Sequence, residues 1–356
     1  MMTDKKDTLI HGGDRQSFLE KFGREPLDFS ANVSPLGVPE TVRKRVAFSL
    51  DRQDRYPDPL CRRLRWKIGE REGVPGEWVL CGNGAADLIF RICRVLRPKK
   101  ALLTAPDFGE YKQALREESC EIRTVTRWES EGFLLHLEDL AGSIHGAELL
   151  FLSNPNNPTG LVTGREELRK ILKLCSNEHC VPVIDECFLD FTEGSEAQSL
   201  IPDLGQNPNL VILRAFTKTY AMAGLRLGYA LCGSKAFAER LQSAGQPWPV
   251  SNVAQTAGIA ALHEEDYVNR LRTLISEERP RMIRALTAIG LRVIPGKANY
   301  LLFCCEDKEL GEKLRKRGIL IRDCRNYAGL TEGWYRIAIR SAAENDRLIH
   351  TLGEVL

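Results

Sequence analysis

The sequence has no long apolar run and little net charge. No stretch approaches the roughly 20 apolar residues of a membrane span, and residues 1–9 are charged and contain no apolar core of a signal peptide. The 50 basic and 48 acidic side chains give a net charge of +2, which provides no general attraction to nucleic acid or anionic lipid. These absences predict a cytoplasmic protein whose partners include neither a membrane nor a nucleic acid.

A pattern of paired cysteines is also missing. The 11 cysteines are an odd number and are scattered through apolar stretches, which favours reduced thiols that act as small buried side chains. Cys175, His179 and Cys180 form one cluster with metal-ligand spacing, but no second pair of ligands accompanies it. We therefore expect no bound metal.

What the chain does have is length and a regular alternation of elements. Between Val79 and Leu213, short apolar strands alternate with amphipathic helices, which predicts parallel βαβ units. The expected fold class is α/β, with a mostly parallel central sheet flanked by helices and a smaller α+β domain. We expect an N-terminal arm at 1–40 that joins the small domain, a large domain at 41–245 and the small domain at 246–356, with the sheet pattern fading after Gly228.

Lys218 lies just past the apolar run Leu210–Leu213, where the end of a buried strand reaches the ligand crevice of an open α/β sheet. An exposed loop position is the ordinary explanation for a lone lysine. In a site that is partly apolar and partly cationic, however, the pKa of a lysine amine falls and the amine can react with a carbonyl carbon. Lys218 is therefore a candidate nucleophile, and the rest of the sequence decides between the two interpretations.

A strand, a glycine turn and a helix start at Val79–Phe90 suggest a phosphate site. Gly84, Ala85 and Ala86 would bring backbone N–H groups and the positive end of a helix dipole to one point. A Gly-x-Gly pattern by itself is weak evidence, because such turns also serve as plain connections. The strand-turn-helix context strengthens the interpretation.

Asn157, Asp185 and Lys218 each follow a predicted strand, and Arg226 lies between glycines eight residues after Lys218. The segments around them read Asn-Pro-Asn-Asn-Pro-Thr-Gly, Val-Ile-Asp-Glu, and Thr-Lys followed by Gly-Leu-Arg-Leu-Gly. Together these segments resemble the fold-type I pyridoxal-phosphate enzymes, the aspartate aminotransferase superfamily. The combination is far more specific than any of its parts, and it favours the nucleophile interpretation of Lys218.

The resemblance implies a role for each of these residues. Lys218 would bind pyridoxal 5'-phosphate covalently and later carry the proton at the substrate Cα, while Asp185 would pair with the pyridine nitrogen. Asn157 would donate a hydrogen bond to the 3-oxygen of the cofactor ring. Each residue, taken alone, also has a purely structural explanation; Asp185, for example, could cap the segment that follows it.

The resemblance also implies how the rest of the cofactor is held. Arg226, Thr217 and the backbone of the helix start at Gly84 to Ala86 would bind its phosphate, and Phe108 would stack on its ring. Tyr56 would reach the phosphate of the neighbouring subunit, because in this superfamily the site is built across a homodimer interface. Alone, Phe108 could equally be a core residue and Tyr56 could pack locally.

Within the superfamily, the chain resembles the histidinol-phosphate aminotransferases and their sister group, the threonine-phosphate decarboxylases of cobalamin synthesis. Four stretches favour the decarboxylases: His11–Gly13, residues 28–37, residues 319–330 and residues 335–345. Phe188 is a further hint, because histidinol-phosphate aminotransferases usually have there a tyrosine that hydrogen-bonds the cofactor. The sequence similarity extends from about His11 to the C-terminus.

This resemblance implies decarboxylation of L-threonine O-3-phosphate to (R)-1-amino-2-propanol O-2-phosphate. Arg336 would bind the substrate carboxylate, Arg322 and His11 its phosphate, and Asn32 would be a further substrate contact. Arginine suits both anions because its planar fork forms paired, charge-assisted hydrogen bonds.

Two alternatives remain open from the sequence. A histidinol-phosphate aminotransferase would use the same cofactor for transamination with 2-oxoglutarate, and the choice depends on which Cα bond stands perpendicular to the cofactor ring. A ligand-sensing domain of a transcription regulator is more remote, because the roughly 40 residues before the core contain no basic recognition helix.

Overall fold

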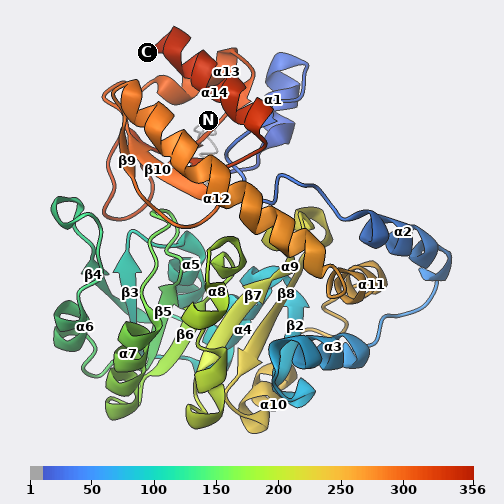
Figure 1. Ribbon diagram of the computed structural model, residues 1–356. Coiled ribbons are helices and arrows are strands. Elements are labelled where there is room, and N and C mark those ends of the chain that lie inside the picture. Colours follow the sequence, from blue (N-terminus) through green and yellow to red (C-terminus); the bar gives the residue numbers. More distant parts are fainter. Residues whose placement is uncertain (1–10) are drawn as a thin grey trace, which may run out of the picture.

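The computed structural model describes residues 11–356, which form two main sheets with helices packed around them (Figure 1). The strands are β1 (Leu27–Asp28), β2 (Val79–Asn83), β3 (Lys100–Ala105), β4 (Glu121–Thr126), β5 (Leu149–Ser153), β6 (Val181–Asp185), β7 (Val211–Ala215), β8 (Leu227–Cys232), β9 (Arg292–Ile294), β10 (Tyr300–Cys304), β11 (Ile319–Leu320), β12 (Arg322–Asp323) and β13 (Trp334–Ala338). The α-helices are α1 (Arg15–Phe22), α2 (Glu40–Ser49), α3 (Arg62–Glu72), α4 (Gly84–Leu96), α5 (Gly109–Glu117), α6 (Leu137–Ser143), α7 (Arg165–Asn177), α8 (Ser195–Gln198), α9 (Phe216–Thr219), α10 (Lys235–Ser243), α11 (Asn252–Ala261), α12 (Glu265–Ala288), α13 (Leu310–Lys316) and α14 (Ala342–Val355).

The larger sheet has seven strands in the order β2-β8-β7-β6-β5-β3-β4. Pairing is parallel from β7 through β4 and antiparallel only where β8 meets its neighbours β7 and β2. All five residues of β5 and of β7 are buried, as expected for continuous apolar strands covered by helices on both faces. The expected α/β class with a mostly parallel central sheet is confirmed.

One expectation about this sheet was wrong. The sheet pattern does not fade after Gly228, because Leu227–Cys232 forms the buried strand β8 between β7 and β2. The connection from β7 to β8 is short and contains only α9 and a 3₁₀ turn, so the chain returns antiparallel instead of crossing over through a long helix. This return places both Lys218 and Arg226 in the short connection that leads from the carboxyl end of β7 to β8.

The smaller sheet is antiparallel, in the order β12-β13-β10-β9. The segment Ile319–Arg322 has the local pattern of one short strand, but it divides between two sheets, because β11 pairs in parallel with β1 of the N-terminal segment and β12 pairs with β13. The Ala338 N–H also donates to the Phe29 carbonyl at 2.8 Å. These contacts attach the segment around Phe29 to the smaller sheet, and the long helix α12 runs diagonally across the molecule (orange in Figure 1).

Among the described helices, none combines the length and apolar character that crossing a membrane requires.

Gly228 lets β8 approach the start of α4. A Cβ atom at this position would lie 2.5 Å from the Ala85 nitrogen and 2.7 Å from the Gly84 carbonyl carbon. Both neighbours are backbone atoms, so no side chain can rotate away. We expect Gly228→Ala to lower the free energy of unfolding by on the order of 2 kcal/mol, measured by urea denaturation.

Gly353→Ala is the matched control, because a Cβ atom there meets nothing within 4 Å and the residue lies in helix α14. It should leave stability unchanged or slightly raised. Equal stability of the two variants would contradict the close approach of β8 and α4.

Candidate active site

A cavity of about 280 Å³ collects nearly all of the predicted site residues. Twelve of them line it: His11, Asn32, Ala85, Ala86, Phe108, Asn157, Asp185, Thr217, Lys218, Arg226, Arg322 and Arg336. Gly84 and Tyr56 are the two that do not. Gly84 lies beneath Arg226, and Tyr56 lies in a neighbouring surface hollow that Arg226 also lines.

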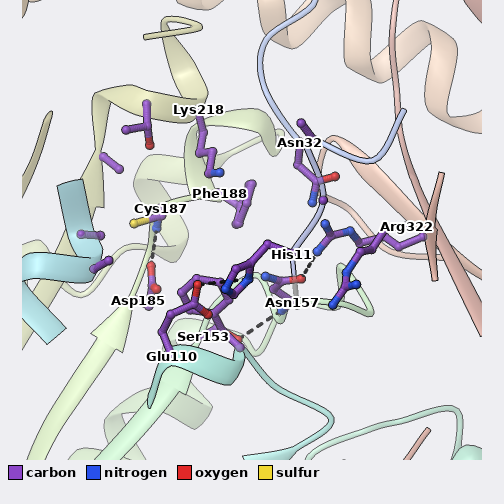
Figure 2. Close-up of a pocket in the computed structure, with 18 of the residues that line it drawn as sticks. His11, Asn32, Glu110, Ser153, Asn157, Asp185, Cys187, Phe188, Lys218 and Arg322 are labelled. Carbon is purple, nitrogen blue, oxygen red and sulfur yellow. Dashed lines mark hydrogen bonds and ion pairs between the residues drawn. The ribbon is translucent and has the colours of Figure 1, made fainter. Parts of the chain in front are cut away.

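The cavity lies at the carboxyl edge of the parallel strands. Asp185 is the last residue of β6, Asn157 follows β5, and Lys218 follows β7 on the short helix α9. Neighbouring parallel strands end at one edge, so residues far apart in the sequence converge there. Figure 2 shows Lys218 and Asp185 on one side of the cavity and Asn32 and Arg322 on the other.

Lys218 is partly buried, and its amine lies 5.8 Å from the centroid of the Phe188 ring. Desolvation lowers the pKa of the Lys218 amine, and the positive charge of Arg336 lowers it further. More of the amine is therefore uncharged at neutral pH than in an exposed lysine. This is the condition that a nucleophilic lysine requires.

Two donors hold the buried carboxylate of Asp185. The Tyr111 hydroxyl donates to Oδ2 at 2.7 Å, and the backbone N–H of Cys187 donates to Oδ1 at 2.9 Å. Tyr111 is fully buried and stacks on Phe151, so its hydroxyl has a fixed position. The carboxylate is oriented toward the cavity and can pair with a cationic ring nitrogen there.

Asn157 connects the two sheets across the cavity. Its Oδ1 accepts hydrogen bonds from Nη1 of Arg336 and, at 3.4 Å, from the Tyr327 hydroxyl. Nη2 of Arg336 donates to the Ser30 carbonyl at 3.2 Å, while the buried Nε has no protein partner. The side-chain Nδ2 of Asn157 and the Nε of Arg336 are thus available to donate hydrogen bonds to a ligand.

The start of α4 and Arg226 form a corner of the cavity that is rich in hydrogen-bond donors. Gly84 has φ +78°, and a Cβ atom there would lie 2.7 Å from Nη2 of Arg226. The backbone N–H groups of the first helical turn and the Thr217 hydroxyl border the same space as the Arg226 guanidinium. This donor set fits a phosphate dianion.

Asn32 in the cavity wall favours a polar ligand. Its side chain is 2% exposed, and neither its Nδ2 nor its Oδ1 has a hydrogen-bond partner in the protein. A buried amide without partners costs free energy. A polar ligand that lies between Asn32 and the lysine would remove that cost.

The far end of the cavity is cationic. Arg322 on β12 and Arg336 on β13 are direct partners across the antiparallel pair, so their side chains share one face of the smaller sheet. Both are buried. A ligand with two anionic groups can therefore be held at two points opposite Lys218.

With this geometry in place, the chain can be compared with known proteins. Residues 24–352 match the model of the family described as aminotransferase class I and II. This chain belongs to that family.

Three similar proteins represent two different enzyme activities. The chain is 39% identical over 97% of its length, and 96% of the relative, to threonine-phosphate decarboxylase of Salmonella typhimurium. The solved structure of L-threonine-O-3-phosphate decarboxylase from Porphyromonas gingivalis gives a TM-score of 0.81 at 27% identity, covering 92% of this chain and 98% of that one. Histidinol-phosphate aminotransferase from Clostridium acetobutylicum gives a TM-score of 0.86 at 29% identity, with the same coverage. The expected fold-type I fold is confirmed.

Several lining residues of this aminotransferase-family cavity had no role in the sequence-based prediction: Glu110, Tyr111, Ser153, Cys187 and Tyr327. Glu110 and Tyr111 follow Phe108 directly, so their position at the start of a helix was a usable signal. Tyr327 lies in the stretch 319–330 that favours the decarboxylases, but its contact with Asn157 depends on the pairing of β12 with β13 and had no signal in the sequence.

In the described residues, Cys175 and Cys180 lie close together without a third potential metal ligand grouped around them. No group of three or more His, Cys, Asp or Glu side chains in residues 11–356 could hold a metal ion. Cys175 and Cys180 are free thiols, both buried. Their proximity raises the pKa of the Cys175 thiol, since the two thiols share a hydrogen bond.

Tyr111 provides a test of the carboxylate's environment. We expect Tyr111→Phe to lower the free energy of unfolding by about 1.5–3 kcal/mol, because the buried Asp185 carboxylate loses a hydrogen bond. Urea denaturation measures the loss. Tyr56→Phe is the control, since the 80% exposed Tyr56 should tolerate it within about 0.5 kcal/mol. Equal effects of the two substitutions would contradict the interaction.

Proposed function

We propose that this protein is a pyridoxal-phosphate-dependent carbon-carbon lyase that decarboxylates L-threonine O-3-phosphate to (R)-1-amino-2-propanol O-2-phosphate, for cobalamin biosynthesis. The observation that carries the proposal is the cavity itself, in which paired arginines on the smaller sheet face a lysine with a lowered pKa. The full-length likeness to the Salmonella decarboxylase supports this reaction among those of the family.

The residues present fit the cofactor. Lys218 would bind it covalently, Asp185 would pair with its ring nitrogen, and Asn157 would donate to its 3-oxygen. The corner formed by α4 and Arg226 would hold its phosphate, and Phe108 would cover its ring. When bound, the cofactor accepts the electron pair of the bond that is broken at the substrate Cα.

The protein's own contribution is to orient that bond. Arg336 binds the substrate carboxylate through its guanidinium group, in which Nε has no partner in the protein. Its Nη1 continues to donate to Oδ1 of Asn157. Arg322, His11 and Asn32 hold the phosphate end. Fixing both ends of a short substrate limits rotation about Cα, so the arginines determine which bond lies perpendicular to the cofactor ring.

Phe188 is consistent with this assignment. It lines the cavity three residues after Asp185 and contacts Tyr300 edge-on, with ring centroids 5.0 Å apart. A phenylalanine provides no hydroxyl to the cofactor at this point, which is a difference from the tyrosine expected in histidinol-phosphate aminotransferases.

Product analysis tests the reaction. We expect the purified protein with pyridoxal phosphate to release carbon dioxide from L-threonine O-3-phosphate and to form the amine phosphate. Lys218→Ala should reduce this rate on the order of 10³-fold or more, because the lysine carries both the cofactor and the proton.

Lys235→Ala is the control, since Lys235 is an exposed residue of α10. Glutamate formed from histidinol phosphate and 2-oxoglutarate, without release of carbon dioxide from threonine phosphate, would favour the aminotransferase instead.

We also propose a homodimer in which Tyr56 completes the neighbouring site. Tyr56 is 80% exposed, stacks on Trp248 with ring centroids 4.6 Å apart, and borders the hollow that Arg226 shares. Phe48 and Trp66 are also strongly exposed. Such aromatic surface is typical of a subunit interface.

Mixed dimers test this arrangement. Equal amounts of Lys218→Ala and Tyr56→Ala subunits, unfolded and refolded together, should recover about a quarter of the wild-type activity, because half of the dimers contain one intact site. Each variant refolded alone should remain inactive or weak. Absence of recovery in a verified mixed dimer would mean that Tyr56 serves its own subunit.

The cysteines support a cytoplasmic location for this activity. All 11 are free thiols, and nine of them are buried.

A further inference from the structure

Glu110 is a largely buried acid in the cationic half of the cavity, and the reaction proposed above gives it no role. It is the second residue of α5, and its side chain is 15% exposed. Its Oε1 lies 3.4 Å from Nδ1 of His11, while its Oε2 is buried without any hydrogen-bond partner. Figure 2 shows the two side chains in contact at the wall of the cavity.

The position of Glu110 is unusual for an acid because it lines the same two cavities as an arginine. Glu110, His11 and Arg322 line both the main cavity and a second cavity that adjoins it. A carboxylate beside the arginine would repel the phosphate that this arginine is proposed to bind. A protonated carboxyl would instead donate a hydrogen bond to it.

The charges around Glu110 come from several elements. Desolvation raises the pKa of Glu110 to about 7, against the lowering effect of Lys218 on α9 and Arg322 on β12, and Asp185 at the end of β6 adds to the rise. His11 from the N-terminal segment faces it directly, and desolvation followed by Arg322, Lys218 and Arg336 lowers the pKa of His11. Tyr327 lies nearby with a raised pKa. The histidine therefore loses its proton more easily than usual, while the glutamic acid that it faces keeps its proton to a higher pH than usual.

We propose that Glu110 is a specificity residue for phosphate monoesters, which binds the substrate phosphate as a neutral carboxylic acid. The dianion enters between Arg322 and His11, Glu110 takes up one proton from solvent, and its O–H donates to a phosphate oxygen. The proton adds to a carboxylate and no covalent bond of the substrate changes. This inference rests on the proposed function for the position of the phosphate, but it requires only a phosphate monoester and no particular reaction.

Calorimetry with isopropyl phosphate tests the proposal. This secondary monoester has no amine or carboxylate, so it cannot react with the cofactor, and in the holoenzyme the cofactor phosphate already fills its own corner. At about pH 8, where a group with a pKa near 7 is mostly ionised, the wild type should take up about one proton per bound ligand. Titrations in buffers of different ionisation enthalpy give this number.

The Glu110→Gln variant separates the two properties of the side chain, its uptake of a proton and its ability to donate a hydrogen bond. The amide can still donate but cannot titrate, so this variant should bind isopropyl phosphate within a few-fold of the wild type and lose most of the proton uptake. Glu110→Ala should bind about ten-fold more weakly or worse. Glu117→Gln, an exposed position on the same helix, is the control and should behave like the wild type.

Thermal unfolding provides a second readout. The pKa of Glu110 in the folded protein lies above its ordinary 4.5, so ionisation costs stability as the pH rises between these two values. Glu110→Gln should therefore gain melting temperature relative to the wild type above about pH 7 and show no such gain below about pH 4.5.

Three results would overturn the proposal: equal proton uptake by wild type and Glu110→Gln, no binding of isopropyl phosphate to the holoenzyme, or a stable Glu110→Gln variant that binds none. Failure of the proposed reaction is recognised separately. A protein that binds isopropyl phosphate with proton uptake but releases no carbon dioxide from threonine phosphate would keep Glu110 in this role and reject the decarboxylase.

Discussion

The convergence of buried cations on one cavity is the constraint on which the site depends. Lys218 lies on α9, Arg322 and Arg336 lie on paired strands of the smaller sheet, and desolvation together with the positive charge of Arg336 lowers the pKa of the Lys218 amine. Within the protein, Asn157 and Tyr327 provide dipoles to Arg336, and Asp185 and Glu110 are the carboxylates that line the cavity. The cavity therefore favours ligands with several negative charges, such as a phosphorylated cofactor together with a phosphorylated amino acid.

The lysine is held in place by a buried ion network beneath it. Arg214 on β7 donates to Glu186 at 2.9 Å and to Asp190 at 2.8 Å, and Asp190 also accepts from the Thr219 hydroxyl at 3.0 Å. These bonds fix the turn of α9 that carries Lys218. Removal of one partner would leave a charge buried and uncompensated, so the network constrains the turn even if its net contribution to stability is small.

Much of the fold and of the cofactor-binding set could be predicted from the chain alone. The β5, β6 and β7 segments are largely apolar; Asp185 ends β6, and Asn157 and Lys218 follow β5 and β7. The prediction failed at β8, where an apolar run returns antiparallel after a short connection, and the run Ile319–Arg322 divides between two sheets in a way that the chain alone does not show. In both places the local pattern is that of a strand, but the partner of that strand is decided by distant residues.

The sequence by itself determined the order of strands and helices and the residues that end each strand, because burial periodicity and turn chemistry are local properties. Only the tertiary structure decided which side chains touch. It brought Tyr111 to Asp185, Arg322 opposite Arg336, and His11 beside Glu110, pairs that are 74, 14 and 99 positions apart in the chain. Such contacts depend on how whole elements pack, and the protonation of a buried group such as Glu110 depends on all of its neighbours together.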